Sequence, residues 1–181
     1  GRAGGRAFTT GGNAGDAGCA MIAATCTMWD TLSWGGETQA LIYNPHTGKV
    51  VGVNALGVAP TGATPEFFRG KGMSYPPEFG PLAAVTPGTP GGIMVMLAEY
   101  GRLPLAEVMA PAIDMADGYP VEQQHVNTLR RQRDWLLKWP ESRRVLLPHP
   151  GDQPPDAGEM FRQPDLAATL RKLVEAEKAA L

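Results

Sequence analysis

The sequence predicts a layered domain of mixed α and β structure, and three observations support this prediction. A helix from Ala14 to about Met28 consists almost entirely of small and apolar residues, which is typical of a helix buried on most of its sides. Two short β-rich runs, 38–43 and 50–54, flank a turn that contains Asn, Pro and Gly. Consecutive apolar residues in the first run indicate a strand covered on both faces. Helices and sheet are therefore expected in separate layers.

Composition limits the classes of function. The chain has 181 residues, 43% of them hydrophobic, with a formal net charge of −2. It can form one domain or a piece of a larger one. The 23 glycines and 17 prolines predict short elements joined by tight turns. A near-neutral charge argues against a nucleic-acid partner. No apolar run approaches the roughly 18 residues of a membrane span, and no signal peptide is visible, so we expect no membrane contact.

The two cysteines, Cys19 and Cys26, are predicted not to form a disulfide with each other. On one helix their spacing separates them by roughly 10 Å. A disulfide needs Cα atoms within about 7 Å. Two small buried thiols suit a reducing compartment, which favours the cytoplasm over the periplasm or secretion.

Capping residues and turns locate the elements of the first half. Residues 1–12 are rich in Gly and Arg and have no period. Asn13 fits a helix N-cap, and Asp16 in the first turn is favoured by the helix dipole. A turn is predicted at 32–36, and residues 57–90 are expected to be rich in loops because of their many prolines.

Helical periodicity accounts for most of the second half. Thr89-Pro90 predicts the start of a helix that ends at Gly101. Further helices are predicted at about 104–117, 121–138 and 165–180, with a proline-rich loop at 148–155. We find no internal repeat and no clear linker. Residues 1–181 are therefore predicted to be a single segment of one domain.

Several segments, in order along the chain, resemble motifs of the gamma-glutamyltranspeptidase family. No single segment is specific, but their order and spacing cover nearly the whole chain from Gly11 onward. The matching segments are 11–17 (GGNAGDA), 33–36 followed by 40–50 (a glycine turn, then strand, turn and strand), 59–60 (the end of the substrate-loop motif), 84–91 (AVTPGTPG), 100–105 (YGRLPL), 111–113 (PAI) and 161–170 (FRQPDLAATL).

The resemblance implies the four-layer αββα sandwich of N-terminal-nucleophile (Ntn) hydrolases, of which this chain supplies the large-subunit part. It implies a precursor that cleaves itself into two subunits. The threonine that opens the small subunit would be the nucleophile, with its own amine as general base. An oxyanion hole would stabilise the tetrahedral intermediate. In this family both lie on the small subunit, so we expect no catalytic residue in this chain. Thr9-Thr10 is no substitute, because it precedes the GGNA motif.

The resemblance also names the expected partners. These are the small subunit from the same precursor and a small-molecule amide, and a dimer of heterodimers is left open. No cofactor is expected. No metal site is expected either, because His46, His125 and His149 lie far apart in dissimilar segments. The basic run 130–133 (RRQR) fits a solvated helix face better than a nucleic-acid site at this net charge.

Four residues are predicted to bind substrate. Asn54, Leu56 and Val58 precede the Pro of the substrate-loop motif and are expected to line the acyl pocket. The alternative is an ordinary strand end. Trp34 beside the glycine turn is the fourth candidate, although a Trp after a buried helix more often belongs to the core.

Two departures from the family pattern matter. Transpeptidases that use glutathione carry an Arg four residues before the Pro, and some amidohydrolase-like relatives carry it two residues before. These positions are Leu56 and Val58 here. Guanidinium pairs bidentately with a carboxylate, so its loss leaves a glutamyl carboxylate unpaired. We therefore predict an acyl group other than γ-glutamyl, and a protein closer to amidohydrolase-like members. In addition, Gly1–Thr10 replaces the family's helix before the GGNA motif.

A second hypothesis assigns the chain to another class. A transpeptidase-like protein that has lost activity would act as a binding or scaffold protein, and the missing Arg is compatible with it. The N-terminus of the small subunit distinguishes the two hypotheses. A processed Thr indicates the enzyme, whereas an uncleaved precursor or another residue at that position indicates the scaffold.

Overall fold

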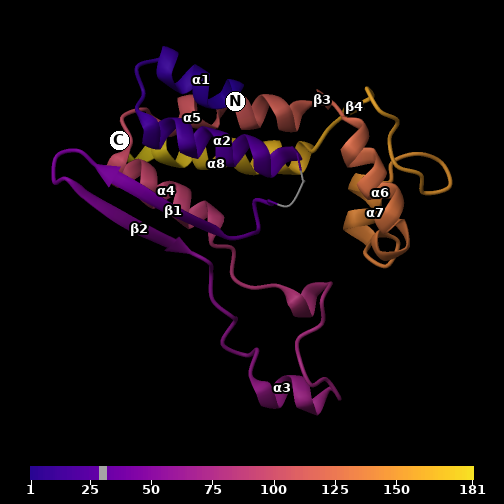
Figure 1. Cartoon of the computed structure of the whole chain (residues 1–181). Coiled ribbons are helices and arrows are strands. Elements are labelled where there is room, and N and C mark those ends of the chain that lie inside the picture. The colour runs from indigo at the N-terminus through magenta and orange to yellow at the C-terminus, as the bar shows by residue number, and fades with distance from the viewer. Residues whose placement is uncertain (29–31) are drawn as a thin grey trace. The chain divides into compact units, whose positions relative to one another are not determined.

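The computed structural model describes residues 1–28 and 32–181, and Figure 1 labels its helices and strands. The chain divides into two compact units, Gly1–Ser33 with Met96–Leu181, and Trp34–Val95. Helix α4 (Thr89–Tyr100) begins in the second unit and ends in the first. The prediction that residues 1–181 form a single segment of one domain concerns the complete protein and stays a prediction.

Packed helices form the main core of the first unit (Figure 1). Helix α2 (Ala14–Met28) packs against α1 (Arg2–Thr9) and against α5 (Leu105–Asp117). Helix α5 also packs against α8 (Pro164–Ala180). Most of the small residues of α2 are buried, as expected for a helix with neighbours on several sides. The predicted core helix is confirmed.

Helix α1 corrects the interpretation that Gly1–Thr10 replaces the family's first helix. Glycine lowers helix stability by about 1 kcal/mol relative to alanine, and the segment has no clear period. However, Gly4 and Ala7 are buried. A Cβ on Gly4 would lie 3.0 Å from Sδ of Met21 in α2. The missing side chain lets the two helices touch, so tertiary packing outweighs local propensity.

The N-terminus of α2 is capped as the sequence predicts. Oδ1 of Asn13 accepts hydrogen bonds from the N–H groups of Gly15 and Asp16, at 2.8 and 3.1 Å. The Nδ2 group of Asn13 donates to the carbonyl of Tyr100 at 2.6 Å. The GGNA motif therefore caps α2 and at the same time binds the end of α4.

The carboxylate of Asp16 holds the connection between α4 and α5. It is fully buried and accepts hydrogen bonds from the backbone N–H groups of Asn13 (2.8 Å), Arg102 (3.0 and 3.1 Å) and Leu103 (3.1 Å). Gly101 makes this approach possible, because a Cβ there would lie 2.8 Å from Oδ1 of Asp16. This aspartate therefore has a structural task, which agrees with its prediction as a first-turn charge.

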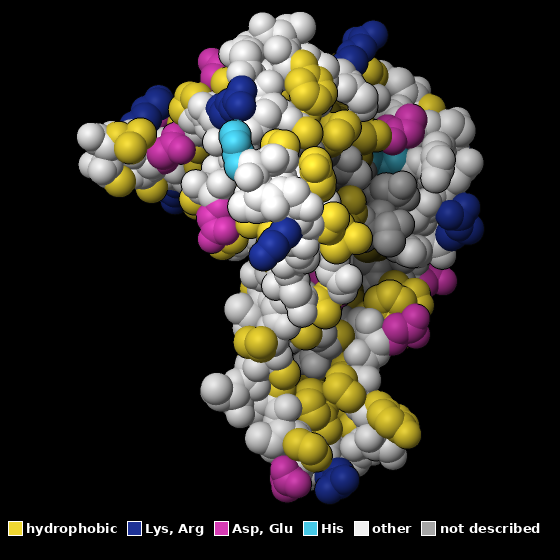
Figure 2. Space-filling view, turned by 60° about the vertical axis from the view of Figure 1, so that its left-hand side comes forward, with side chains coloured by type: hydrophobic (Ala, Val, Ile, Leu, Met, Phe, Trp, Pro, Cys, Tyr) yellow, Lys and Arg dark blue, Asp and Glu magenta, His cyan; other side chains and the backbone are white. Residues whose placement is uncertain are grey.

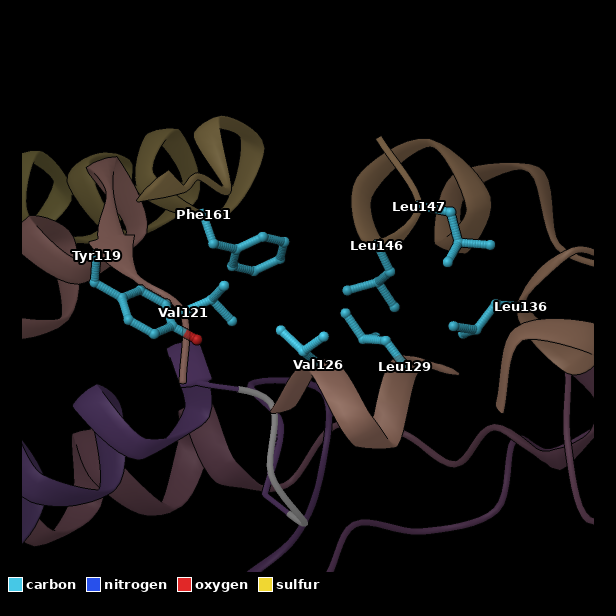
Figure 3. Packing of buried hydrophobic residues seen from close by; sticks show 8 residues of the cluster. All are labelled: Tyr119, Val121, Val126, Leu129, Leu136, Leu146, Leu147 and Phe161. Atoms are coloured by element: carbon cyan, nitrogen blue, oxygen red, sulfur yellow. The ribbon is translucent and has the colours of Figure 1, made fainter. Parts of the chain in front are cut away.

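A smaller apolar cluster is formed by side chains of α6 (Gln123–Leu136), α7 (Pro140–Leu146) and the segments next to them. Strands β3 (Tyr119–Pro120) and β4 (Met160–Phe161) pair antiparallel beside it. The sequence predicts α6 but not the short α7. Figure 3 shows the side chains of this cluster: Tyr119, Val121, Val126, Leu129, Leu136, Leu146, Leu147 and Phe161.

The second unit contains a hairpin with one bare apolar face. Strands β1 (Thr38–Asn44) and β2 (Lys49–Ala55) pair antiparallel, as predicted. On one face Leu41, Tyr43 and Val50 are 81%, 63% and 63% exposed. The prediction that both faces are covered is therefore wrong for the described part of this chain. Consecutive apolar residues showed that both faces are apolar, but not that both covering layers belong to this chain.

A loop-rich segment leaves the hairpin and returns at α4, as predicted. It contains the short helix α3 (Pro65–Gly70), which Thr64 caps through a hydrogen bond from Phe67, and a single 3-10 turn at Pro81–Ala83. Hydrophobic side chains gather at the lower end of Figure 2, where Figure 1 places α3. The exposed apolar residues of this segment include Phe67 and Tyr75.

None of the helices in the described part of the chain combines the length and the apolar character that crossing a bilayer requires.

Candidate functional site

Three glycine-containing segments of the second unit meet through their backbones. The carbonyl of Gly36 accepts hydrogen bonds from the N–H groups of Gly88 and Thr89, both at 3.0 Å. The N–H of Thr86 donates to the carbonyl of Val58 at 2.9 Å. We call this junction, formed by residue 36 and segments 54–58 and 86–89, the glycine neck. It closes the loop-rich segment at its base.

A buried pair of hydroxyl groups anchors the glycine neck to the hairpin. The Oγ1 atoms of Thr38 and Thr89 lie 3.0 Å apart, and both residues are buried. Thr38 opens β1, and Thr89 opens α4 at the predicted helix start. A buried hydroxyl pair of this kind satisfies both groups and fixes their register. The first turn of α4 is therefore fastened to the start of β1.

Three of the four predicted substrate-binding residues lie together on one segment of the glycine neck. Asn54 ends the exposed side of β2, and its Oδ1 accepts a hydrogen bond from the N–H of Leu56 at 3.2 Å. Leu56 is half-buried and Val58 is 69% exposed. Trp34 is half-buried in the turn before Gly36. The role of these four residues in an acyl pocket stays a prediction.

Asn54 also borders a shallow hollow on the bare face of the hairpin. The hollow measures about 470 Å³, and Gly52, opposite Leu41 in the register, contributes no side chain to it. The carboxamide side chains of Gln39 and Asn54, which are paired in the register, line one end, and Leu41 lines the other. The lining residues are Gln39, Ala40, Leu41, Gly52, Val53 and Asn54.

The segments of the glycine neck carry no basic side chain. Between Lys49 and Arg69 the sequence contains no Lys or Arg. Residues 34–38 contribute one charge, the carboxylate of Glu37, and residues 86–92 are uncharged. An anionic group held at the neck would therefore meet a carboxylate in these segments, and no guanidinium. This local charge agrees with the loss of Arg at positions 56 and 58.

Sequence reasoning missed the partners of the predicted pocket segment. The N–H of Thr86 donates to the carbonyl of Val58, Gly88 lies against the carbonyl of Ala55, and Gly36 in turn binds Gly88; no side-chain pattern reveals these backbone contacts. The available signal is glycine itself. Each of the three segments has a glycine, Gly36, Gly57 or Gly88, that neither ends a helix nor forms a hairpin turn. Such a glycine is typical of a place where two backbones approach closely.

The thiols are not suited to nucleophilic chemistry. Burial, followed by the nearby charge of Asp16, raises the pKa of Cys19 to about 12, and burial raises the pKa of Cys26 to about 11. Both groups are therefore protonated near neutral pH, whereas a reactive cysteine needs its thiolate. Neither forms a disulfide, as predicted from their spacing.

In the described part of the chain, one group of three residues comes close enough to share a metal ion. Ligand atoms of His149, Asp156 and Glu159 lie within 4.8 Å of one another. Nε2 of His149 contacts Oε1 of Glu159 at 2.8 Å, and the N–H of Asp156 donates to Oε2 of Glu159 at 2.9 Å. The hydrogen bond with His149, followed by that from Asp156, lowers the pKa of Glu159. These contacts explain the group as a loop fastening.

The arginines of the RRQR run have partners within the chain. Arg130 lies 3.5 Å from the carboxylate of Asp156. Arg133 donates to the carbonyls of Gly151 and Asp152, both at 2.8 Å. These contacts fasten the loop after α7 to α6. They support the structural interpretation of this basic run.

Comparisons with known proteins identify the family and the fold of this chain. The family model described as Gamma-glutamyltranspeptidase matches residues 1–181. The gamma-glutamyltranspeptidase of Helicobacter pylori superposes with a TM-score of 0.89 at 32% identity, covering 97% of this chain and 51% of that chain. The fold is thus that of the large-subunit segment of an Ntn hydrolase. The chain belongs to the gamma-glutamyltranspeptidase family.

Curated relatives include proteins with different names for their activity. The glutathione hydrolase-like YwrD proenzyme of Bacillus subtilis is 31% identical over 99% of this chain and 34% of its own length. The oxamate amidohydrolase proenzyme of Klebsiella pneumoniae is 32% identical over 90% of this chain and 31% of its own length. The chain therefore spans about a third of these relatives.

Proposed function

We propose that this chain is the large-subunit segment of an Ntn amidohydrolase or acyltransferase that cleaves a small amide. The nucleophile is the N-terminal Thr of a small subunit cut from the same precursor. Its hydroxyl attacks the amide carbonyl and passes its proton to the α-amine. The leaving amine takes that proton when the C–N bond breaks, which leaves an acyl ester on Thr. Water or an acceptor amine then releases the acyl group.

The observation that carries this proposal is the glycine neck. Its segment 54–58, whose sequence leads into the residues that resemble the family's substrate-loop motif, is held by hydrogen bonds from Thr86 to Val58 and from Leu56 to Asn54. In the proposal, this segment is a wall of the acyl pocket, and Trp34 stands in the turn beside it. The proposed role of the chain is to shape the pocket, whereas the reacting atoms lie on the small subunit.

The bare face of the hairpin supports the need for a partner. A sheet of two strands is marginally stable in water unless further strands or a covering layer join it. Leu41, Tyr43 and Val50 form an apolar surface that is open in this chain. The relatives are proenzymes about three times as long. The proposed small subunit would provide the missing layer.

The acyl group in this proposal is neutral and is not γ-glutamyl. A carboxylate bound beside Leu56 and Val58 has no guanidinium partner there, and Glu37 is the charged residue of the adjoining turn. Loss of one partner of a buried charge pair costs about 2–5 kcal/mol. This corresponds to roughly 30-fold to several thousand-fold in kcat/KM. The oxamate amidohydrolase among the relatives is named for an amide other than a γ-glutamyl amide; because oxamate is itself an anion, this relative supports the departure from γ-glutamyl and not the neutral charge.

The test uses the full-length precursor after maturation. Glutathione, γ-glutamyl p-nitroanilide and acetyl p-nitroanilide are compared by kcat/KM. We expect turnover of the neutral anilide and little of the other two. Leu56→Arg is expected to raise the kcat/KM for the γ-glutamyl anilide at least tenfold. The control Gln132→Arg, which adds the same charged group at an exposed position of α6, should have no effect. Efficient turnover of glutathione by the natural protein contradicts the proposed specificity.

A further inference from the structure

Two glycines of the neck face each other's backbone. A Cβ on Gly57, which has a φ of +73°, would lie 1.9 Å from the carbonyl oxygen of Thr86. A Cβ on Gly88 would lie 2.0 Å from the carbonyl oxygen of Ala55 and 2.7 Å from the nitrogen of Gly57. Real Cβ atoms essentially never approach other atoms within 3.0 Å. The two chain segments therefore touch only because both positions lack a side chain.

Gly88 is the more informative of the two positions. Its φ lies outside the left-handed range, so any residue can adopt its backbone conformation, whereas Gly57 would be strained by a side chain in any surroundings. The constraint at Gly88 is purely steric. A methyl group there must move away from the Ala55 carbonyl by more than 1 Å to reach an ordinary contact.

The rest of the junction confines such a movement. One helical turn after Gly88, a Cβ on Gly92 would lie 2.6 Å from Cβ of Ala55, so the end of β2 is contacted both by Gly88 and by the first turn of α4. The buried hydroxyl pair between Thr38 and Thr89 fastens the same turn of α4 to β1. The hairpin and α4 are therefore held together. The segment with freedom to move is the one that follows Ala55, which carries Leu56 and Val58.

We propose that Gly88 is a positioning residue for acyl selection: its missing side chain sets where Leu56 and Val58 stand in the pocket wall. This inference rests on the proposed function of residues 54–58. A methyl group at position 88 moves the wall but touches no reacting atom. Misplacement of a pocket group by about 1 Å lowers activity by about 100-fold. The loss depends on the acyl chain, because only groups that reach the wall are affected.

The experiment compares Gly88→Ala with the matched control Gly91→Ala in the mature full-length enzyme. Gly91 lies in the first turn of α4, three residues after Gly88, and a Cβ there meets nothing within 4 Å. The probes are acetyl and hexanoyl p-nitroanilide. We expect Gly88→Ala to lower the kcat/KM by about 100-fold for the hexanoyl probe, whose chain reaches the wall, and to change the ratio between the probes at least fivefold. Gly91→Ala should leave the ratio within twofold of the natural enzyme.

A structural readout accompanies the kinetics. The N–H of Thr86, which donates to Val58, should exchange with solvent faster in Gly88→Ala than in the natural enzyme, while the amides of α2 remain unchanged. If Gly88→Ala does not assemble, Pro87→Ala loosens segment 86–89 without a clash and should change the ratio between the probes at least twofold relative to the natural enzyme.

The outcomes separate the two proposals. The positioning role is overturned if the probe ratio is unchanged in Gly88→Ala, or in Pro87→Ala where Gly88→Ala does not assemble. The proposed function still holds in that case, provided that the natural enzyme cleaves acyl anilides. A mature protein that cleaves neither anilide and forms no acyl-enzyme removes the proposed function and this inference together.

Discussion

Replacement of Asp16 by Asn is expected to loosen the junction between α2 and the connection from α4 to α5. The carboxylate is fully buried and accepts backbone N–H groups through both oxygens. Asparagine keeps one of these oxygens and points an NH2 group at the donors on the other side. Arg102 keeps an acceptor because its N–H bonds to both oxygens, but the N–H of either Asn13 or Leu103 then has none.

The magnitude follows from these contacts. A hydrogen bond to a charged group contributes about 1.5–3 kcal/mol. A negative charge in the first turn of a helix adds about 0.3–1 kcal/mol. For Asp16→Asn the two effects together give a loss of about 2–4 kcal/mol. If the junction opens locally, this loss corresponds to roughly 30- to 900-fold faster exchange of the amides it protects.

Native-state hydrogen exchange of the assembled protein measures this effect at the amides of Asn13, Arg102 and Leu103. The matched control is Asp114→Asn on α5, where the carboxylate is exposed and lies 3.9 Å from the guanidinium of Arg6. Such a surface pair contributes about 0–1 kcal/mol, so the control should exchange almost as the natural protein does. Equal exchange in the two variants would refute the assignment of Asp16 as the centre of this junction.

Three further predictions concern other parts of the first unit. Gly101→Ala should lower the thermal midpoint, because its Cβ would lie 2.6 Å from a carbonyl of the preceding turn, whereas Gly18→Ala meets nothing within 4 Å and should raise it slightly. Iodoacetamide at neutral pH should leave Cys19 and Cys26 unmodified in the native protein and label both after denaturation, as mass spectrometry can show; rapid native labelling contradicts their burial. Glu159→Gln should be less stable than the natural protein near pH 7. Because folding lowers the pKa of Glu159, the difference in unfolding free energy between the two proteins should fade as the pH falls below about 4.3. Urea unfolding at several pH values measures this difference. A difference that stays constant with pH contradicts the pairing of Glu159 with histidine.

Local signals predicted much of the fold. Asn13 as a cap, the small residues of α2 and the Thr89-Pro90 helix start were each correct, because capping and periodicity depend on neighbours in sequence. Helix α1 was missed because its stability depends on contact of Gly4 with α2, which the local sequence does not show. Elements that fold by tertiary contact lie outside the range of such signals.

The candidate site was predicted less completely. The family resemblance directed attention to residues 54–58, and the structure brings them together with the PGTP segment. It did not identify Thr86 or Gly88 as their partners, since those contacts are between backbones far apart in sequence. The apolar pattern of β1 likewise showed two apolar faces but not which layer covers Leu41. The sequence therefore showed that a surface is apolar, but not which part of the protein packs against it.

The account depends most directly on the nucleophile arriving on a second chain. Intact-mass measurement of the purified full-length protein, combined with N-terminal sequencing, tests this. The account predicts two chains whose masses together match the precursor plus one water, with Thr as the first residue of the smaller chain. One uncut precursor, or a smaller chain that begins with another residue, contradicts it.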